Sequence, residues 1–460
     1  MRIHAAVAVV LLSTAASALP RGMTPVHPGR NFGGLFERTT AAPANAYLNY
    51  YGGHIVSNAH VVPVMWGSNV PSQVSSGMQG FYAAITNSTH FDVQAEYNTN
   101  ILDYAGNPGT NQLLGRGSAG PTVTISPSIS STSITNDQIA TELQAQIRAG
   151  HLPPSDANTI YMIHFPAGMK ITLPDGNGGT AGSCTQFCAY HNTIAHSPSN
   201  IFYGVIPNVT TDGCELGCGP LGGGFNNTTA VSSHELMETV TDCEVGLATN
   251  NAPPLAWYDP QGQDGENGDI CNGQQGTISS GGQSYTVQLE WSNTHGACIA
   301  GPTATDFAIV LSPSNRNISA GSTAKYTVSA VATAGSVGNI TLAADGLPAG
   351  ITGTFDKTSI APGQTATLTV SVTSKATNGA DYFTIHGSSA GITRQSKSIA
   401  TVSGGAAGGG GGGGGGCPSG TVDVGGVCVP AGCSSSGTGA TWLAMLGVGA
   451  LLFRRRQLRS

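Results

Sequence analysis

The sequence predicts an α+β domain followed by an all-β sandwich, in a protein that leaves the cytoplasm. Three observations lead to this: a strand-helix-strand order of apolar patterns in the first half, short alternating strands later, and an unusual composition. Of 460 residues, 66 are glycine and 25 proline, and only 9% are charged, which is typical of loop-rich extracellular β proteins. No lysine or arginine patch precedes the C-terminal cluster, so the composition disfavours nucleic acid as a partner.

Residues 1–18 are expected to be a secretion signal that is removed. Arg2 precedes an apolar run at residues 5–12, and Ala16-Ser17-Ala18 then provides a small-x-small cleavage pattern. The run is short and Pro20 follows it at once, which disfavours a buried helix. We therefore exclude this segment from the fold.

Residues 46–302 are expected to form one mixed domain. The segments 60–66 and 159–165 are apolar and rich in β-branched residues, as buried strands are. Between them, residues 137–148 carry apolar side chains four positions apart, which predicts a helix. This order of elements indicates an α/β or α+β core.

Residues 306–403 have a different texture. Stretches such as 325–329 and 365–370 alternate between polar and apolar residues and are broken by turn residues, which predicts a β-sandwich. The segment is similar to the immunoglobulin-like modules appended to many secreted bacterial enzymes, and we expect a spacer or weak binding role. The one G-x-S-x-G match, at residues 387–391, falls here, where no strand-to-helix elbow is expected, so a serine hydrolase is disfavoured.

The C-terminal region resembles the sorting signal of myxobacterial surface proteins. Its parts are a glycine-rich linker at 404–416, a small Cys-bearing segment at 417–433, and a tail at 434–460 that holds an apolar run and three arginines. The resemblance implies cleavage near Gly432-Cys433 and a location at the cell surface or outer membrane, or release from it. A short transmembrane helix is the alternative, and in both cases the tail would contact the membrane before processing.

Export implies that most of the ten cysteines form disulfide bonds. Three close pairs in the sequence are Cys184/Cys188, Cys214/Cys218 and Cys417/Cys428, and Cys271 could be joined to Cys298 at the end of the mixed domain. The connectivity stays open. If Cys433 belongs to the sorting signal, Cys243 is left over.

The strongest chemical signal is the segment His234-Glu235-Leu236-Met237-Glu238. Residues four apart share a helix face, so His234 and Glu238 project together, as in the H-E-x-x-H zinc helix with its second histidine replaced. A carboxylate is an accepted zinc ligand, and Glu235 would be the general base that takes a proton from water. Ser232 and Ser233 suit a helix start, which would place His234 in the first turn. The alternative is a surface helix with solvated acids.

Two residues are candidates for a third metal ligand with equal weight, Glu266 and His191. Asp242, one turn beyond Glu238, could orient a ligand or be a surface acid, and Asp269 could act likewise. The acidic loop 259–269 suits calcium as well as zinc. The remaining histidines considered, for which core or surface roles are preferred, are His54, His60, His164, His196 and His295.

An ordered set of motifs resembles the EXORDIUM, or phosphate-induced, family of plant extracellular proteins and its microbial relatives. The set comprises Tyr50-Tyr51-Gly52-Gly53, Cys184-x3-Cys188-x2-His191, the Cys214/Cys218 pair, the His234 helix, Trp257-Tyr258, Glu266-x2-Asp269-x-Cys271 and the stretch from Trp291 to Cys298. The resemblance implies a secreted, zincin-like domain associated with the cell wall. The chain departs from the family pattern at Asp242-Cys243 and at Asn267-Gly268, and the second departure concerns the packing of the acidic loop.

Two functions follow from these patterns. The first is a surface-anchored zinc-dependent hydrolase, with a peptidase as the favoured class, acting on an extracellular peptide or cell-wall substrate. The second is a non-catalytic extracellular protein for cell-wall binding or signalling, built on a zincin-like scaffold with a structural metal or calcium.

Overall fold

The computed structural model describes residues 23–25, 46–174, 179–211, 213–220, 223–259, 265–405, 421–424 and 427–430. The chain divides into two compact units, Met1–Gly408 and Gly409–Ser460. Of the second unit, the structure describes only the hairpin of β26 (Thr421–Val424) and β27 (Val427–Pro430). The expected secretion signal, Cys417, the side chain of Cys428, Gly432-Cys433 and the apolar run of the tail lie outside the described residues.

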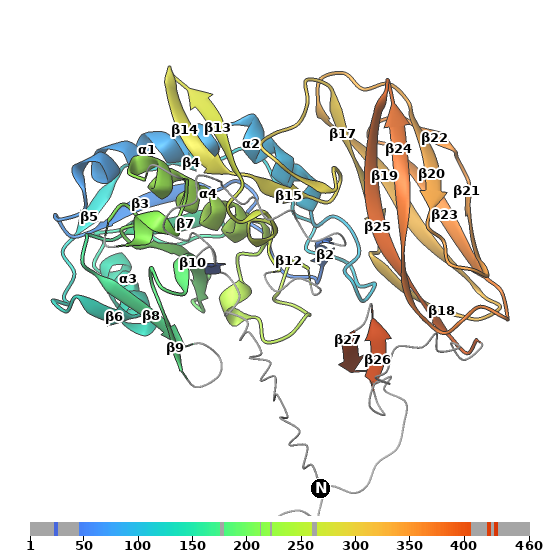
Figure 1. The fold of residues 1–460 in the computed structure, drawn as a ribbon, viewed down its shortest axis with the longest axis horizontal. Helices are drawn as coiled ribbons and strands as arrows, with labels where there is room; N and C mark the ends of the chain where they lie inside the picture. Colours follow the sequence, from blue (N-terminus) through green and yellow to red (C-terminus); the bar gives the residue numbers. More distant parts are fainter. Residues whose placement is uncertain are drawn as a thin grey trace, which may run out of the picture. The chain divides into compact units, whose positions relative to one another are not determined.

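A seven-stranded mixed sheet forms the centre of the first domain (Figure 1). Its order is β1-β10-β11-β7-β3-β4, and β5 also pairs with β3. The strands are β1 (Met23–Pro25), β3 (His60–Trp66), β4 (Ser118–Ala119), β5 (Val123–Ile125), β7 (Thr159–His164), β10 (Phe187–Ile194) and β11 (Ile201–Ile206). Strands β11, β7, β3, β4 and β5 run parallel, whereas β10 runs antiparallel to both of its neighbours, β11 and β1. The strands predicted at 60–66 and 159–165 are thereby confirmed.

Helices cover both faces of this sheet. Along β3, Val61 packs against the helices α1 and α4, and Val62 packs toward α3, because successive strand residues point to opposite faces. The predicted helix at 137–148 is confirmed as α3, and Thr135 with Gln138 forms a capping box at its start. The elements on the two faces are α1 (Ser72–Ile85) and α4 (Phe225–Thr241) on one, and α3 (Asn136–Arg148), β6 (Ser133–Thr135), β8 (Lys170–Pro174) and β9 (Thr180–Gly182) on the other.

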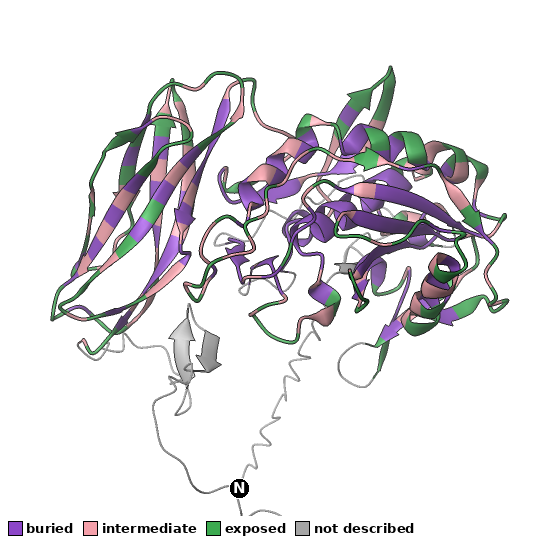
Figure 2. Ribbon diagram, turned by 180° about the vertical axis from the view of Figure 1, so that it is seen from behind, coloured by how far each residue is buried: buried purple, intermediate pink, exposed green. Residues whose placement is uncertain are grey.

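Helix α4 is enclosed by protein, as is much of the central sheet (Figure 2). Residues 227–241 are all buried, and the hairpin of β13 (Gln275–Ser280) and β14 (Gln283–Gln288) packs over them. The helix begins at Phe225, so the predicted start at Ser232 or Ser233 is wrong and His234 lies in the third turn. The physical reason is that a serine hydroxyl can bond within a helix: Ser233 Oγ donates to the carbonyl of Ala230 at 2.6 Å.

Short elements complete the first domain around the end of α4. They are β2 (Asn49–Tyr50), α2 (Thr89–Asp92), η1 (Val93–Tyr97), η2 (Cys214–Leu216), η3 (Val245–Leu247), β12 (Trp257–Tyr258), η4 (Asp269–Cys271), β15 (Glu290–Ser292) and β16 (Ala297–Ile299). Strand β12 pairs with β2, and β15 pairs with β16. Tyr50, Tyr97 and Trp257 pack together in the small core beneath them.

Three disulfide bonds stabilise this domain. Cys271 is bonded to Cys298, as expected. The other two bonds join Cys184 to Cys214 and Cys188 to Cys218, so cysteines that are close in the sequence are not bonded to each other. Each bond links the start of β10 to the segment around η2, which the fold places beside it. Cys243 is free and buried. Several disulfide bonds in one domain are typical of exported proteins.

The predicted β-sandwich is confirmed. Its two sheets, β17-β19-β23-β21 and β18-β25-β24-β20-β22, enclose a separate apolar core that includes Phe307, Tyr326, Leu368 and Phe383. The strands are β17 (Asp306–Ser312), β18 (Asn315–Ser319), β19 (Thr323–Ala334), β20 (Ile340–Asp345), β21 (Ile351–Phe355), β22 (Ser359–Ile360), β23 (Thr365–Val372), β24 (Gly379–Ser389) and β25 (Ile392–Ser403). The G-x-S-x-G match lies in the hairpin between β24 and β25 and is not followed by a helix.

Buried polar contacts join the sandwich to the first domain. Asp306 accepts hydrogen bonds from Arg394 Nε at 2.7 Å and from the Thr303 N–H at 2.9 Å, and it lies 3.1 Å from His295 Nε2. The Tyr47 hydroxyl lies 3.1 Å from Ser396 Oγ. Among the helices of the described residues, none is both long and apolar enough to cross a membrane.

Candidate metal centre

His234 and Glu238 meet on the buried face of α4. His234 Nε2 lies 2.9 Å from Glu238 Oε1 and 3.4 Å from Asp269 Oδ1, which comes from η4. Within the described part of the chain, neither nitrogen of His234 makes a hydrogen bond of good geometry. Zinc bonds of about 2.0–2.2 Å in a tetrahedron place ligand atoms roughly 3.3–3.6 Å apart. The spacing of these three atoms is close to that of ligands around one ion.

His191 forms a second group on the other side of Glu238. It projects from β10 toward α4, and its Nδ1 lies 3.4 Å from Glu235 Oε2 and 3.5 Å from Glu238 Oε2. Its Nε2 lies 3.3 Å from Glu266 Oε1. Gly204, the partner of His191 on β11, is closely packed, because a Cβ there would meet Met162 Sδ at 2.6 Å and lie 3.9 Å from Glu235 Cβ.

The structure therefore brings the two candidate third ligands, His191 and Glu266, into contact with each other. The side chain that joins His234 and Glu238 is instead Asp269, which had been assigned a supporting role. Asp242 is fully buried, so the surface alternative for this residue is wrong. Its Oδ1 accepts a hydrogen bond from the Ala256 N–H at 2.9 Å and anchors the chain that returns toward β12.

Gly268 is a part of the centre that the sequence patterns did not reveal. A Cβ at this position would lie 2.9 Å from Glu238 Oε1 and 3.0 Å from His234 Nδ1, so only glycine lets the loop approach these side chains. The Gln288 side chain donates to the Gly268 carbonyl at 2.7 Å, and Asn267 donates to Gln94 at 2.8 Å. Asn267 and Gly268 thus pack closely against neighbouring side chains of the first domain.

Glu290 was also missed. It is fully buried in β15, and within the described residues neither of its carboxylate oxygens has a hydrogen-bond partner. Charge interactions with His234, Glu238 and Asp269 place it near the centre. The available signal was an acid between the apolar residues Leu289 and Trp291, a pattern that indicates a buried carboxylate.

The centre is strongly acidic. Five buried carboxylates surround two imidazoles. The carboxylates are Glu235, Glu238, Glu266, Asp269 and Glu290. Charges removed from water in this way require compensation by protons or by a cation.

Burial and the neighbouring charges shift the pKa values of these groups in different directions. Burial raises the pKa of Glu235 and Glu266, and it raises the pKa of Glu290 well above its usual value. Burial opposes ionisation of Glu238 too, but the charge of His234 and the contact with His191 lower its pKa to about 2. Burial would lower the pKa of both histidines, but the neighbouring carboxylates raise it well above normal. A metal ion would displace these protons, because its ligands bind in their deprotonated forms.

The other histidines lie outside the centre. His164 is buried beside Tyr82, whose hydroxyl is 3.0 Å from Nε2, and His54 is exposed beside Glu244. His60 contacts Ser118, and His295 contacts Ser292 and Asp306. These contacts agree with the core and surface roles expected for them.

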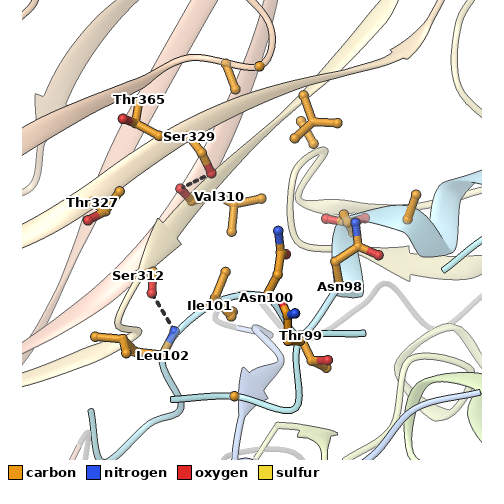
Figure 3. Close-up of a pocket in the computed structure, with 18 of the residues that line it drawn as sticks. Asn98, Thr99, Asn100, Ile101, Leu102, Val310, Ser312, Thr327, Ser329 and Thr365 are labelled. Atoms are coloured by element: carbon orange, nitrogen blue, oxygen red, sulfur yellow. Dashed lines mark hydrogen bonds between the residues drawn. The ribbon is translucent and has the colours of Figure 1, made fainter. Parts of the chain in front are cut away.

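A cleft of about 680 Å³ lies elsewhere, between the loop after η1 and the sandwich (Figure 3). Asn98, Asn100 and Thr99 line one side, and Thr327 and Ser329 lie on the other. Glu96 is its one charged lining residue, and that carboxylate accepts a hydrogen bond from the Thr294 N–H at 2.8 Å. The residues that line the cleft include no histidine and no pair of acids.

No described protein family and no curated protein matches this sequence. Similar solved structures include domains 4 and 5 of the S-layer protein SbsC, at 16% identity and a TM-score of 0.17, over 28% of this chain and 65% of that chain. The BIgI domain of the beta protein from S. agalactiae bound to CEACAM1 has 16% identity and a TM-score of 0.15, and the match covers 21% of this chain and 96% of that chain. Titin domain M7 has 18% identity and a TM-score of 0.15, and the match covers 22% of this chain and 99% of that chain.

The chain spans 65% or less of the first S-layer chains that it matches. TM-scores this low carry no inference about the first domain or its metal centre. The function must therefore be argued from the site itself.

Proposed function

We propose that residues 46–302 form an exported, zincin-like metal-dependent hydrolase domain, with a peptidase as the favoured class. The observation that carries the proposal is the convergence of His234 Nε2, Glu238 Oε1 and Asp269 Oδ1, with Glu235 adjacent on the same helix. The mixed sheet with an antiparallel strand β10 beside this helix supports the fold assignment.

His234, Glu238 and Asp269 would hold the metal, and Glu235 would accept the proton of the attacking water. A bound zinc ion polarises a carbonyl group and makes water more acidic. Burial raises the pKa of Glu235, which moves this carboxylate toward the range in which a general base is effective near neutral pH. The peptide class rests on the H-E-x-x-E order, in which the acid that follows the histidine serves as base.

Zinc is the proposed metal in preference to calcium. The two imidazoles of His191 and His234 lie within the centre, and imidazole nitrogen suits zinc and other transition metals, whereas calcium selects oxygen ligands. Glu238 and Asp269 provide the oxygen ligands that zinc also accepts.

Burial of the centre favours a second candidate function. His234, Glu235 and Glu238 have no exposed surface, and Asp269, the most exposed of the carboxylates, is only 8% exposed. A metal enclosed to this degree suits a structural role in a non-catalytic, cell-wall-associated binding or signalling protein. Asp269 marks the side from which solvent reaches the centre, so a substrate would have to approach from there.

The test uses the processed full-length protein. It should contain at least about one zinc per chain and cleave a mixture of denatured proteins. Glu235→Gln should retain the fold and the ion held by His234, Glu238 and Asp269 but lose cleavage, because an amide cannot accept the proton. Glu215→Gln, outside the centre, is the matched control and should retain activity.

A folded, metal-free protein would exclude the hydrolase. A metal-containing protein that cleaves nothing, together with a Glu235→Gln variant that binds cell-wall polysaccharide as the parent does, would favour the second function.

A further inference from the structure

The two oxygens of Glu238 face two different groups of side chains. Oε1 lies 2.9 Å from His234 Nε2, and Asp269 Oδ1 completes that group at 3.4 Å from the same nitrogen. Oε2 lies 3.5 Å from His191 Nδ1, and Glu235 Oε2 completes the second group at 3.4 Å from that nitrogen. In each group the three ligand atoms lie within 4.8 Å of one another.

We propose that the centre binds two divalent metal ions, bridged by the carboxylate of Glu238. The first ion is the one assigned above, and the inference rests on that proposed function. The second ion is held by His191 Nδ1, Glu235 Oε2 and Glu238 Oε2. Two-metal hydrolytic sites have ions about 3.5–4 Å apart, a spacing that a bridging carboxylate provides.

The surroundings of His191 prepare Nδ1 as a ligand. Glu266 Oε1 lies 3.3 Å from Nε2, and its negative charge would favour the tautomer with the proton on that nitrogen once an ion occupies the Nδ1 side. The lone pair of the neutral imidazole is then on Nδ1, which faces Glu235 and Glu238. A carboxylate behind a metal-binding histidine is the usual means of setting its tautomer. Glu266 is thus a positioning residue.

A single bound ion would leave one carboxylate oxygen of Glu238 without a partner. Glu238 Oε2 is buried and, within the described residues, makes no hydrogen bond. A single ion beside His234 would use Oε1 and leave Oε2 in this state, and a buried charged atom without a partner destabilises the folded protein. A second ion beside His191 would coordinate Oε2 directly.

The charge balance leads to the same conclusion. With five ionised carboxylates and two neutral imidazoles, the centre carries a formal charge of about −5, which one divalent ion reduces to about −3 and two reduce to about −1. Two ions come close to neutralising the centre.

The second ion changes the role of Glu235. Its Oε2 would bind the ion, and its Oε1 would accept the proton from water. Both ions then stabilise the oxygen atoms that gain negative charge during hydrolysis, as in other two-metal sites.

The experiment titrates the metal-free, full-length protein with Zn²⁺ and, separately, with Mn²⁺. Equilibrium dialysis should give about two ions per chain, and the manganese form should show a spin-coupled pair by electron paramagnetic resonance. His191→Gln should bind about one ion and lose the coupling. His164→Gln, which alters an equally buried histidine outside the centre, should still bind two.

The outcomes of the metal titration separate the two-metal proposal from the proposed hydrolase. A single ion in the parent protein, unaffected by His191→Gln, would overturn the two-metal proposal and leave the proposed hydrolase intact. Two uncoupled manganese ions would place the second ion elsewhere and would also overturn it. A protein that binds no ion would exclude both proposals. Because coupling is measured in the parent protein, the test does not depend on the folding of the variants.

Discussion

Substitution of Gly268 by alanine should damage the metal centre without touching any proposed ligand. The backbone at Gly268 has φ −73° and ψ −42°, a conformation that alanine adopts freely. At such a position, glycine-to-alanine changes usually stabilise a protein by about 0.4–1 kcal/mol. Here the added methyl group would lie 2.9 Å from Glu238 Oε1 and 3.0 Å from His234 Nδ1, in a region that has no free surface.

The clash sets the expected magnitude. An extra methyl group in a packed interior costs about 1–3 kcal/mol, so it outweighs the backbone gain and the metal-free protein should lose roughly 1–2 kcal/mol of stability. Relief of the clash requires His234 and Glu238 to move by a few tenths of an ångström. Disturbance of groups that position ligands typically weakens metal binding by about 10–100-fold. At saturating zinc this adds a loss of about 1.4–2.7 kcal/mol.

Denaturant unfolding with and without zinc measures the two losses separately, and competition with a chelator measures the affinity. Gly338→Ala is the matched control, because its backbone is not left-handed and the nearest atom to the new Cβ is Ser389 Oγ at 3.8 Å. A Gly268→Ala protein that unfolds and binds zinc as the parent does would refute the packing of this loop against the ligands.

Two further predictions concern the fold around the centre. Burial lowers the pKa of His164 to about 3, so this histidine stays neutral in the folded protein at higher pH. In the unfolded chain the same histidine takes up a proton below about pH 6.5. The folded state therefore loses stability as the pH falls from about 6.5 towards 3. Between pH 7 and pH 5, His164 should account for about 2 kcal/mol of the decrease in the free energy of unfolding. The His164→Gln variant should therefore lose about 2 kcal/mol less than the parent over this range, as measured by urea unfolding in the presence of a chelator. Equal losses would show that His164 is protonated in the folded state. The double change Cys271→Ala and Cys298→Ala opens a cross-link between positions 27 residues apart and should cost about 3.5 kcal/mol in thermal or denaturant unfolding. It should also weaken zinc binding, since Cys271 ends the helix η4 that carries Asp269; unchanged affinity would contradict this link.

Local sequence patterns predicted much of the fold. The apolar stretch at 60–66, the four-residue spacing at 137–148 and the alternation at 365–370 correspond to β3, α3 and part of β23. In each of these, neighbours along the chain determine the periodicity, so the pattern is visible without the partners. The start of α4 was misjudged because serine can cap a helix or bond within it, and the choice depends on the surrounding protein.

The metal centre was predicted only where it lies on one helix. His234, Glu235 and Glu238 could be recognised because helix geometry alone places residues four apart on the same face. His191, Glu266 and Asp269 come from β10 and from the loop at η4, and their distances to α4 depend on how the sheet and the loop pack.

The sequence by itself determined the α+β domain and sandwich, the paired cysteines, and a histidine and two acids arranged as in a metal-binding helix. Only the tertiary structure decided that the disulfides cross between Cys184–Cys214 and Cys188–Cys218, that Asp269 joins His234, and that Glu238 faces two groups at once. The physical reason is that these contacts join segments about 30 or more residues apart. No local periodicity encodes such distances, because they result from the packing of the whole domain.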